Sequence, residues 1–261
     1  ADSKYSHIRL WGSIGFIVAA LSLGVMIDSY GERSLIYALL VTQLVIFFLA
    51  FILPEKKINF TKFNKRSIWP ILKQREVIML LLSCALMVSS HGLLYNFYSI
   101  FLEDHSYSGA TIGLLWSVGV VFEILIFLLM PKILRKFTLK SVLLISLAFA
   151  VLRFFLIGAY VDSILILIAA QIMHAATFGS FHVASIQLIA HFFYNEHQAR
   201  GQSLYNSITY GVGGAIGGLG GGYMIEYSGM ANTFMLSAIL PFMGFFVLLL
   251  GLKTKFKAEF K

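Results

Sequence analysis

The chain has 261 residues, of which 59% are hydrophobic and only 12% are charged, and its mean hydropathy is +0.84. Ordinary soluble domains carry about 25% charged residues, so a soluble protein of this composition would lack the polar surface needed to cover its core. The net charge of +8 does not point to a nucleic-acid-binding protein, because the basic residues lie in short segments between apolar runs.

Eight apolar segments follow one another along the chain, and each is long enough to cross a bilayer, which takes about 20 residues in a helix. None shows the sustained alternation of polar and apolar residues that is typical of membrane-spanning β-strands. The sequence therefore predicts an all-α integral membrane protein with about eight transmembrane helices. We place these spans near residues 6–28, 34–53, 77–102, 109–130, 139–159, 163–190, 203–225 and 231–252.

The connections between the spans alternate between basic and acidic composition. Cytoplasmic connections carry an excess of Lys and Arg. We therefore predict a multi-pass protein of the bacterial inner membrane, with both ends and the long loop 54–75 in the cytoplasm. The basic connections hold Lys4 and Arg9, seven Lys and Arg residues between 56 and 75, Lys132, Arg135, Lys136, Lys140, Arg200 and Lys253, and the acidic ones hold Asp28, Glu32, Glu103, Asp104, Asp162 and Glu226.

The loop over residues 54–75 divides the chain unevenly, with two spans before it and six after it. We expect residues 1–53 to be the last two helices of an N-terminal bundle, residues 76–252 to be a C-terminal six-helix bundle, and residues 253–261 to be a cytoplasmic tail. The chain begins with Ala1 in a polar stretch that has no signal-peptide pattern. We therefore expect an N-terminal truncation that removes four helices of the first bundle.

Four stretches carry a resemblance to a known family: residues 5–16 (YSHIRLWGSIGF), 113–123 (GLLWSVGVVFE), 174–182 (HAATFGSFH) and 200–207 (RGQSLYNS). They resemble the phenylpropionate-permease branch of the major facilitator superfamily, and the resemblance covers essentially the whole chain. It implies that the spans correspond to helices 5–12 of a twelve-helix transporter with the major facilitator fold. It also implies a monomer whose substrate binds near the bilayer midplane, between the two halves.

Two charged residues lie in the middle of neighbouring spans. An ionisable side chain inside a span costs about 2.5–3.5 kcal/mol on insertion scales, so it usually faces an aqueous cavity or a partner. Glu123 and Arg153 are such residues. A buried carboxyl group beside a cation is suited to load and release a proton, and an arginine can bind a carboxylate with two hydrogen bonds. We predict that both residues serve proton coupling, and the alternative is a structural ion pair.

His174 and His182 are eight residues apart and therefore lie on roughly one face of the sixth span. Histidine titrates near physiological pH, so we predict that both take part in proton coupling. The alternative is that each makes only a hydrogen bond in helix packing. Eight residues extend about 12 Å along a helix, too far for both rings to bind one metal ion. We therefore predict no metal site and no cofactor.

The third span is enriched in polar and aromatic side chains, which include His91, Tyr95 and Asn96. A planar substrate would stack against such a surface, so we predict that these residues bind substrate. The alternative is that they are hydrogen-bond partners between helices.

Residues 211–222 contain four overlapping Gly-x-x-x-Gly repeats. A phosphate-binding loop would follow a strand and end in Lys-Ser or Lys-Thr, and both features are missing from this sequence. We predict instead that the glycines allow close packing of helices.

The resemblance extends to the related oligosaccharide:proton symporters, and it implies roles for single residues. Arg9 corresponds to an arginine that contacts the sugar in those proteins, and Phe16 corresponds to an aromatic residue that stacks on the sugar. Arg153 and His174 correspond to their coupling arginine and histidine, and Glu123 lies about one turn from their eighth-span glutamate.

The sequence also departs from the symporter pattern. Thr177 stands where the tenth span of the symporters has a proton-carrying glutamate, and their charge pairs are replaced by His91, Gln171 and Tyr210. These departures argue against a sugar as the substrate. They leave Glu123 or a histidine as the proton carrier.

We therefore expect a secondary active transporter rather than an enzyme, with a small aromatic carboxylic acid as the substrate and protons as the coupling ion. In this reading Arg9 and Arg153 attract the substrate anion, and Phe16 and Tyr95 flank its ring. Two alternatives remain. One is a nucleoside or sugar:proton symporter, and the other is a truncated membrane protein that transports nothing, because four missing helices would leave the cavity incomplete.

Overall fold

The computed structural model describes residues 2–53 and 67–253, with side chains from residue 11 onward. All regular secondary structure in these ranges is helical. The elements are α1 (Asp2–Tyr30), α2 (Arg33–Ile52), α3 (Trp69–Leu72), α4 (Arg75–Asp104), α5 (Gly109–Lys136), α6 (Leu139–Ala159), α7 (Ile164–His174), the π-helix η1 (Ala175–Ser180), α8 (Phe181–Phe192), the 3₁₀-helix η2 (Asn195–His197), α9 (Gln198–Asn206), the π-helix η3 (Ser207–Gly213), α10 (Gly214–Ser237) and α11 (Ile239–Gly251).

The described ranges hold seven helices that are long and apolar enough to cross a membrane. The last of them, Asn195–Gly251, has 57 residues, more than twice the length that one span requires. Its backbone leaves the helical region at Gly229, where φ is 76° and ψ is 165°, and the chain turns back there to cross again. The prediction of eight spans in an all-α membrane protein is therefore confirmed.

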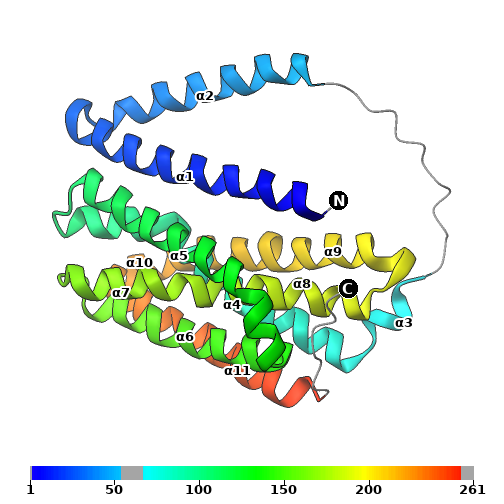
Figure 1. Cartoon of the computed structure of the whole chain (residues 1–261). Helices are drawn as coiled ribbons and strands as arrows, with labels where there is room; N and C mark the ends of the chain where they lie inside the picture. The colour runs from blue at the N-terminus through cyan, green and yellow to red at the C-terminus, as the bar shows by residue number, and fades with distance from the viewer. Residues whose placement is uncertain (1, 54–66, 254–261) are drawn as a thin grey trace.

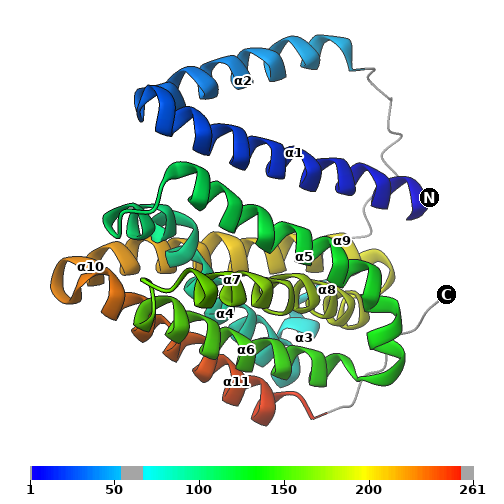
Figure 2. The ribbon, with the colours of Figure 1, turned by 60° about the vertical axis from the view of Figure 1, so that its left-hand side comes forward.

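The helices are arranged as a pair and a larger bundle (Figures 1 and 2). Helices α1 and α2 lie together above the other helices, and α1 contacts the bundle chiefly along α5. The buried hydrophobic core begins at Val77 and extends to Leu252, so it belongs to the bundle. The apolar side chains of α2 are exposed in the described chain, as expected for a helix whose surroundings in a membrane are lipid or further helices.

The glycine-rich segment lies against α4, in the centre of the bundle. A side chain at Gly217 would collide with the carbonyl oxygen of Ser89, and a Cβ atom at Gly213 would lie 2.8 Å from the carbonyl oxygen of Ala85. Glycine therefore allows the two helix backbones to touch, which confirms the close packing predicted for residues 211–222.

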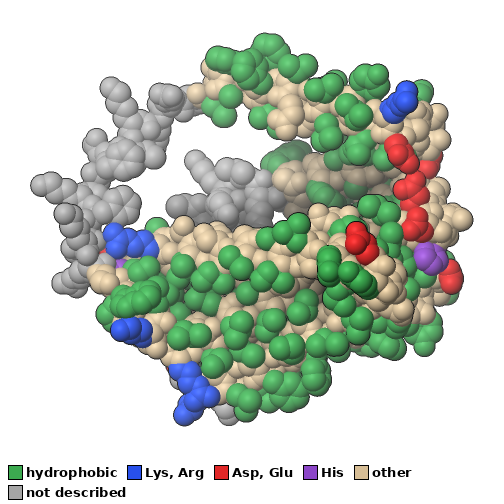
Figure 3. Space-filling model, turned by 180° about the vertical axis from the view of Figure 1, so that it is seen from behind, with side chains coloured by type: hydrophobic (Ala, Val, Ile, Leu, Met, Phe, Trp, Pro, Cys, Tyr) green, Lys and Arg blue, Asp and Glu red, His purple; other side chains and the backbone are tan. Residues whose placement is uncertain are grey.

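Most charged side chains on the face drawn in Figure 3 lie at the two ends of the molecule. Figure 3 shows that the Asp and Glu side chains gather at the end where α1 and α2 join, whereas most Lys and Arg side chains lie at the opposite end. This segregation follows the charge pattern of the connections, and the orientation in the membrane stays a prediction.

Three details differ from the expected elements. Helix α5 continues through Pro131 to Lys136, and a short helix, α3, lies within the predicted long loop. Two spans contain a π-helical turn, η1 or η3, which periodicity did not indicate. Residues 54–66 of the predicted loop and residues 254–261 of the predicted tail lie outside the described residues.

Candidate functional site

A cavity of about 460 Å³ lies where α1 meets the bundle. Five elements supply its walls, and they come from four separate spans of the chain. On α5 the lining residues are spaced by four and three positions, which is one helical face. The lining consists of Gly12, Ser13 and Phe16 on α1, Tyr95 on α4, Trp116, Val120 and Glu123 on α5, His174 at the end of α7, and Phe178 on η1.

The acidic and basic groups of the cavity wall are Glu123 and His174. Glu123 Oε2 lies 3.8 Å from His174 Nε2, and the two side chains are only 12% and 7% exposed. The other ring nitrogen of His174, Nδ1, is buried and has no hydrogen-bond partner in the described part of the chain. An unsatisfied buried polar atom costs about 1–3 kcal/mol. Such atoms are rare in folded proteins. Nδ1 of His174 is one of them, because none of the described residues supplies its hydrogen bond.

Arg153 lies behind this wall and is fully buried. Its guanidinium donates hydrogen bonds to the carbonyl oxygen of Ala170 (2.9 Å), to Gln171 Oε1 (3.3 Å) and to Thr177 Oγ1 (3.3 Å). Within the described ranges, none of its hydrogen bonds ends on a carboxylate. The positive charge is therefore solvated by dipoles and not cancelled by a hydrogen-bonded counter-ion, so it adds a positive potential to the apolar surroundings of the cavity.

His91 connects Arg153 to the wall. Its Nδ1 lies 3.0 Å from the carbonyl oxygen of Met87, to which it donates, and its Nε2 accepts from Arg153 Nη1 at 3.4 Å. One donating and one accepting nitrogen describe a neutral ring with the proton on Nδ1. The His91 and His174 rings lie 6.0 Å apart, so His91 stands between Arg153 and the residue that faces Glu123.

A column of stacked rings runs along the π-helical turn. His174 and Phe178 stack at 5.3 Å with an interplanar angle of 9°, and Phe178 and His182 stack at 6.0 Å with an angle of 8°. His182 Nδ1 then lies 3.0 Å from the Tyr210 hydroxyl group on η3. The wider turn of a π-helix brings residues four apart nearly into line, and such turns are frequent at functional sites.

Aromatic rings form the remaining wall. Trp116 stacks on Tyr95 at 6.1 Å and an angle of 22°, and its edge contact with Phe16 has a centroid distance of 6.5 Å. The indole Nε1 donates a hydrogen bond of 3.0 Å to Ser99 Oγ. This bond and the packing of three rings fix the orientation of the indole.

The structure brings together four of the predicted site residues and separates the others from them. Phe16, Tyr95, Glu123 and His174 line one cavity. Arg153 and His91 lie behind its wall, and His182 is at the far end of the ring column. Asn96 donates its hydrogen bond back to the carbonyl oxygen of Gly92 in its own helix. Arg9 lies on α1, and its side chain is outside the described part.

Two aromatic residues of the cavity were not predicted as site residues. Trp116 lies seven positions before Glu123, and Phe178 lies midway between His174 and His182. Residues at these spacings share a helical face, so extending each predicted residue along its own face would have indicated both.

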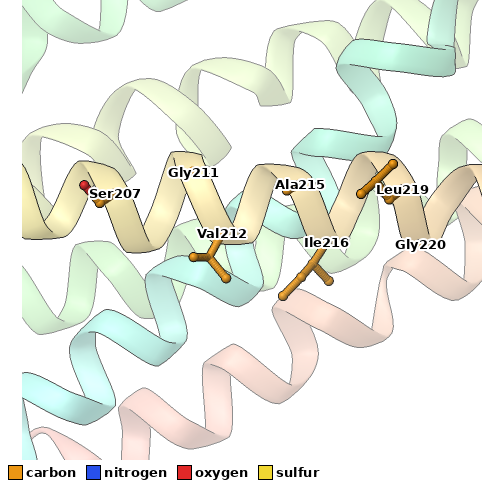
Figure 4. A pocket seen from close by; sticks show the side chains of 7 residues that line it. All are labelled: Ser207, Gly211, Val212, Ala215, Ile216, Leu219 and Gly220. Atoms are coloured by element: carbon orange, nitrogen blue, oxygen red, sulfur yellow. The ribbon is translucent and has the colours of Figure 1, made fainter.

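A larger hollow of about 650 Å³ lies along η3 and α10, away from these groups. Figure 4 shows its lining: Ser207, Gly211, Val212, Ala215, Ile216, Leu219 and Gly220. The serine hydroxyl is the single polar side chain in this set, so the hollow offers little for recognising a polar solute. In the described ranges no three His, Cys, Asp or Glu residues are grouped as a metal site would require.

Comparison with known proteins shows which family the chain belongs to. The sequence matches the MFS_1 like family over residues 1–236. It is 30% identical over 245 residues to the probable 3-phenylpropionic acid transporter of Escherichia coli (strain K12), a match that covers 92% of this chain and 64% of that protein. It is 24% identical over 268 residues to the nucleoside permease NupG of the same strain, with coverages of 95% and 63%.

The fold has a solved counterpart. A crystal structure of a mutant nucleoside transporter NupG superposes with a TM-score of 0.80 at 20% sequence identity, and it covers 95% of this chain and 68% of that one. The chain thus spans about 64% of the length of the first curated relatives it matches. The family match over most of the chain and the shared fold lead to one assignment: the chain belongs to the MFS_1 like family, within the major facilitator superfamily.

Proposed function

We propose that the protein is a secondary active transporter that carries a small aromatic carboxylate across the membrane together with a proton. One observation carries this proposal: a cavity of about 460 Å³ combines aromatic rings from four elements with a shielded carboxyl–imidazole pair. Ligand pockets typically have volumes of about 300–1,000 Å³ and apolar walls with a few placed polar groups. The naming of one relative as a probable 3-phenylpropionic acid transporter supports the same substrate class.

The ring of the substrate would lie against the aromatic wall. Phe16, Tyr95, Trp116 and Phe178 all border the cavity. Aromatic rings prefer offset-stacked or edge-to-face contacts, each worth about 0.5–1.5 kcal/mol beyond the area they bury. Rings from four separate elements can meet a planar substrate on its faces and its edge.

The carboxylate of the substrate would lie toward His174, in the positive potential of Arg153. The obstacle is the charge of Glu123, which faces the same cavity. Two like charges about 4 Å apart repel by about 4 kcal/mol at an effective dielectric constant of 20. A proton on Glu123 removes this repulsion, so the anion and the proton bind together. This mutual requirement is the physical basis of the proposed symport.

The whole transporter would then work by alternating access. In this proposal α1 and α2 belong to one half of a twelve-helix monomer in the bacterial inner membrane, and α4–α11 form the other half. The ends of the chain and the loop over 54–75 face the cytoplasm, in accord with the gathering of Lys and Arg at that end. The substrate site would be exposed to each side of the membrane in turn.

A nucleoside is the second candidate substrate. The same stacked Tyr95 and Trp116 rings would accept a planar base. NupG, which is similar to this chain in sequence and in fold, is named as a nucleoside permease or transporter. A neutral nucleoside carries no net charge to be attracted by the positive potential of Arg153, and for this reason we favour the acid.

Uptake by cells that express the complete gene tests the proposal. Radiolabelled 3-phenylpropionate and a labelled nucleoside are supplied separately, each with and without a protonophore. We expect protonophore-sensitive accumulation of the acid alone. Matched cells carry the Glu103→Gln variant, which alters an acidic residue at the end of α4, and they should accumulate the acid normally. If neither solute accumulates while the protein is present in the membrane, the aromatic-acid assignment is wrong.

A further inference from the structure

The N-terminus of α5 is capped by a side chain from another helix. Asp28, near the end of α1, accepts a hydrogen bond of 2.6 Å from the backbone nitrogen of Gly109 through Oδ1 and one of 2.8 Å from that of Ala110 through Oδ2. The next two amide groups of α5 are capped locally, because Thr111 N donates to Ser108 Oγ and Ile112 N donates to the Ser108 carbonyl oxygen. The first four amide groups of α5 are thus all satisfied, two of them by α1.

These two hydrogen bonds join groups of opposite charge. A helix N-terminus carries a partial positive charge and four amide groups without a partner in the helix. A carboxylate placed there makes charge-assisted hydrogen bonds, which are stronger than neutral ones. If α1 moves away from α5, Gly109 and Ala110 lose their acceptor and must find water.

Small residues bring the two helices into backbone contact beside this cap. A side chain at Gly24 would collide with the carbonyl oxygen of Gly109, and a side chain at Gly113 would collide with that of Ala20. Further along α1 the contact loosens, since a Cβ atom at Gly12 would meet no other atom within 4 Å. Gly12 instead borders the cavity. The two helices therefore form a tight seam from Asp28 to Ala20 that ends at the cavity.

This seam lies at the end of the molecule where α1 and α2 join and where the acidic side chains gather (Figures 1 and 3). Just beyond the seam, Phe16 meets Trp116 edge to face at the border of the cavity. A solute that passes between α1 and α5 at this end must first separate the two helices. Along the contact between α1 and α5, the structure is therefore closed at the Asp28 end.

We propose that Asp28 is the latch of a gate: its carboxylate holds α1 on the N-terminus of α5 and keeps the cavity closed at that end. Opening this end breaks both hydrogen bonds and separates the backbones at Gly24 and Gly113. The latch favours the state closed at the Asp28 end over the state open there, and it does so whatever solute is carried. The inference rests on the proposed function only because a transporter needs both states.

Cysteine labelling tests the latch without any substrate. A cysteine replaces Val120, which borders the cavity, in the complete gene product, and a membrane-impermeant maleimide is applied from each side in separate experiments. The protein without the added cysteine gives the background, to which Cys84 contributes little because it is buried. We expect Asp28→Ala to raise the labelling rate from the Asp28 side about three- to tenfold, as expected for the loss of about 0.7–1.4 kcal/mol.

Three further variants make the result specific. Asp28→Asn keeps an acceptor oxygen without the charge and should give an intermediate rate. Gly113→Ala forces the seam apart and leaves Asp28 in place, so it should also raise labelling. If Asp28→Ala does not fold, Asp28→Asn decides whether the carboxylate is the latch. Glu32→Ala removes an acidic residue of the α1–α2 turn and should label like the parent protein.

Equal labelling of the parent, Asp28→Asn and Gly113→Ala, each confirmed as folded by gel filtration, would overturn the proposal. An increase in Glu32→Ala as large as that in Asp28→Ala would overturn it too, since it would trace the effect to net charge. If the parent protein takes up no aromatic acid, the labelling result still stands, because the labelling needs no substrate. The proposed function and the latch can therefore fail independently.

Discussion

Replacing Glu123 with glutamine removes the carboxylate from the cavity wall and leaves a side chain of the same size. In the structure this carboxylate is 3.8 Å from His174 and only 12% exposed, so little water screens its charge. A substrate anion at about 4 Å would be repelled by about 4 kcal/mol at an effective dielectric constant of 20. That energy corresponds to roughly a thousandfold effect of the proton on anion binding. Glutamine carries no charge, so the variant should bind the anion without a proton.

The loss should appear in accumulation and not in exchange. With one proton per anion, a pH difference of one unit drives about tenfold accumulation at equilibrium, because one unit is worth about 1.36 kcal/mol. Proteoliposomes that contain the complete Glu123→Gln protein should reach a ratio of about one, while they still exchange labelled for unlabelled 3-phenylpropionate. The uptake rate of the parent protein should fall as the outside pH rises, and that of the variant should not.

Two controls make this assay decisive. Glu103→Gln, at the end of α4, changes the same functional group outside the cavity lining and should accumulate like the parent. Exchange measured in the same vesicles shows that the Glu123→Gln protein is inserted and active. Tenfold accumulation by the variant under the same pH gradient would refute the reasoning, because the proton would then be carried elsewhere.

Three further predictions concern the aromatic wall, the buried cation and the packing of α10. Trp116→Ala should raise the KM for 3-phenylpropionate uptake about tenfold, since an aromatic contact is worth up to about 1.5 kcal/mol beyond its area, whereas Trp116→Phe should stay within about threefold; equal KM values would remove the ring from the site. Arg153→Gln should reduce anion uptake about tenfold, because a unit charge about 10 Å from the anion attracts it by about 1.7 kcal/mol at an effective dielectric constant of 20, and unchanged uptake would make this cation structural. Gly217→Leu should lower the melting temperature in detergent, because its side chain would enter the Ser89 backbone and overpacking costs about 1–3 kcal/mol, whereas Gly220→Leu, with open space around it, should melt like the parent.

The membrane class, the number of spans and the family could all be predicted from the sequence. A bilayer demands about 20 apolar residues for each crossing, and this demand is visible in any window of the chain. The motifs that indicated the family are likewise local, and the family match over residues 1–236 confirms the family that they indicated. Because this family consists of transporters, the prediction that the chain is not an enzyme is confirmed as well. The division into bundles at residues 54–75 stays a prediction.

The apolar pattern of the spans also located the ionisable side chains within the membrane, but not their partners. It placed Glu123 and Arg153 in the middle of two spans, and each is indeed shielded from the surface. The structure sets Glu123 against His174, and it gives Arg153 three uncharged acceptors on the next helices. Periodicity defines the inward face of a helix, whereas the crossing of two helices defines which inward residues meet. Predicting that crossing requires contacts between residues far apart in the chain.

The π-helical turns and the Asp28 cap depend on the same long-range contacts. The turn η1 adds one residue to a helical turn and aligns His174, Phe178 and His182, although the local sequence carries no signal for it. In the sequence, Asp28 is one of several acidic residues in the connections between spans. Nothing local indicates its hydrogen-bond partner, because Gly109 is 81 residues away. The sequence by itself determined the eight membrane spans, because transfer of apolar side chains into lipid is a local property. It also determined the family, because the motifs that indicate the family are short segments of the chain. Only the tertiary structure decided which side chains share a cavity and which helix N-terminus Asp28 caps, because these depend on the distances between helices.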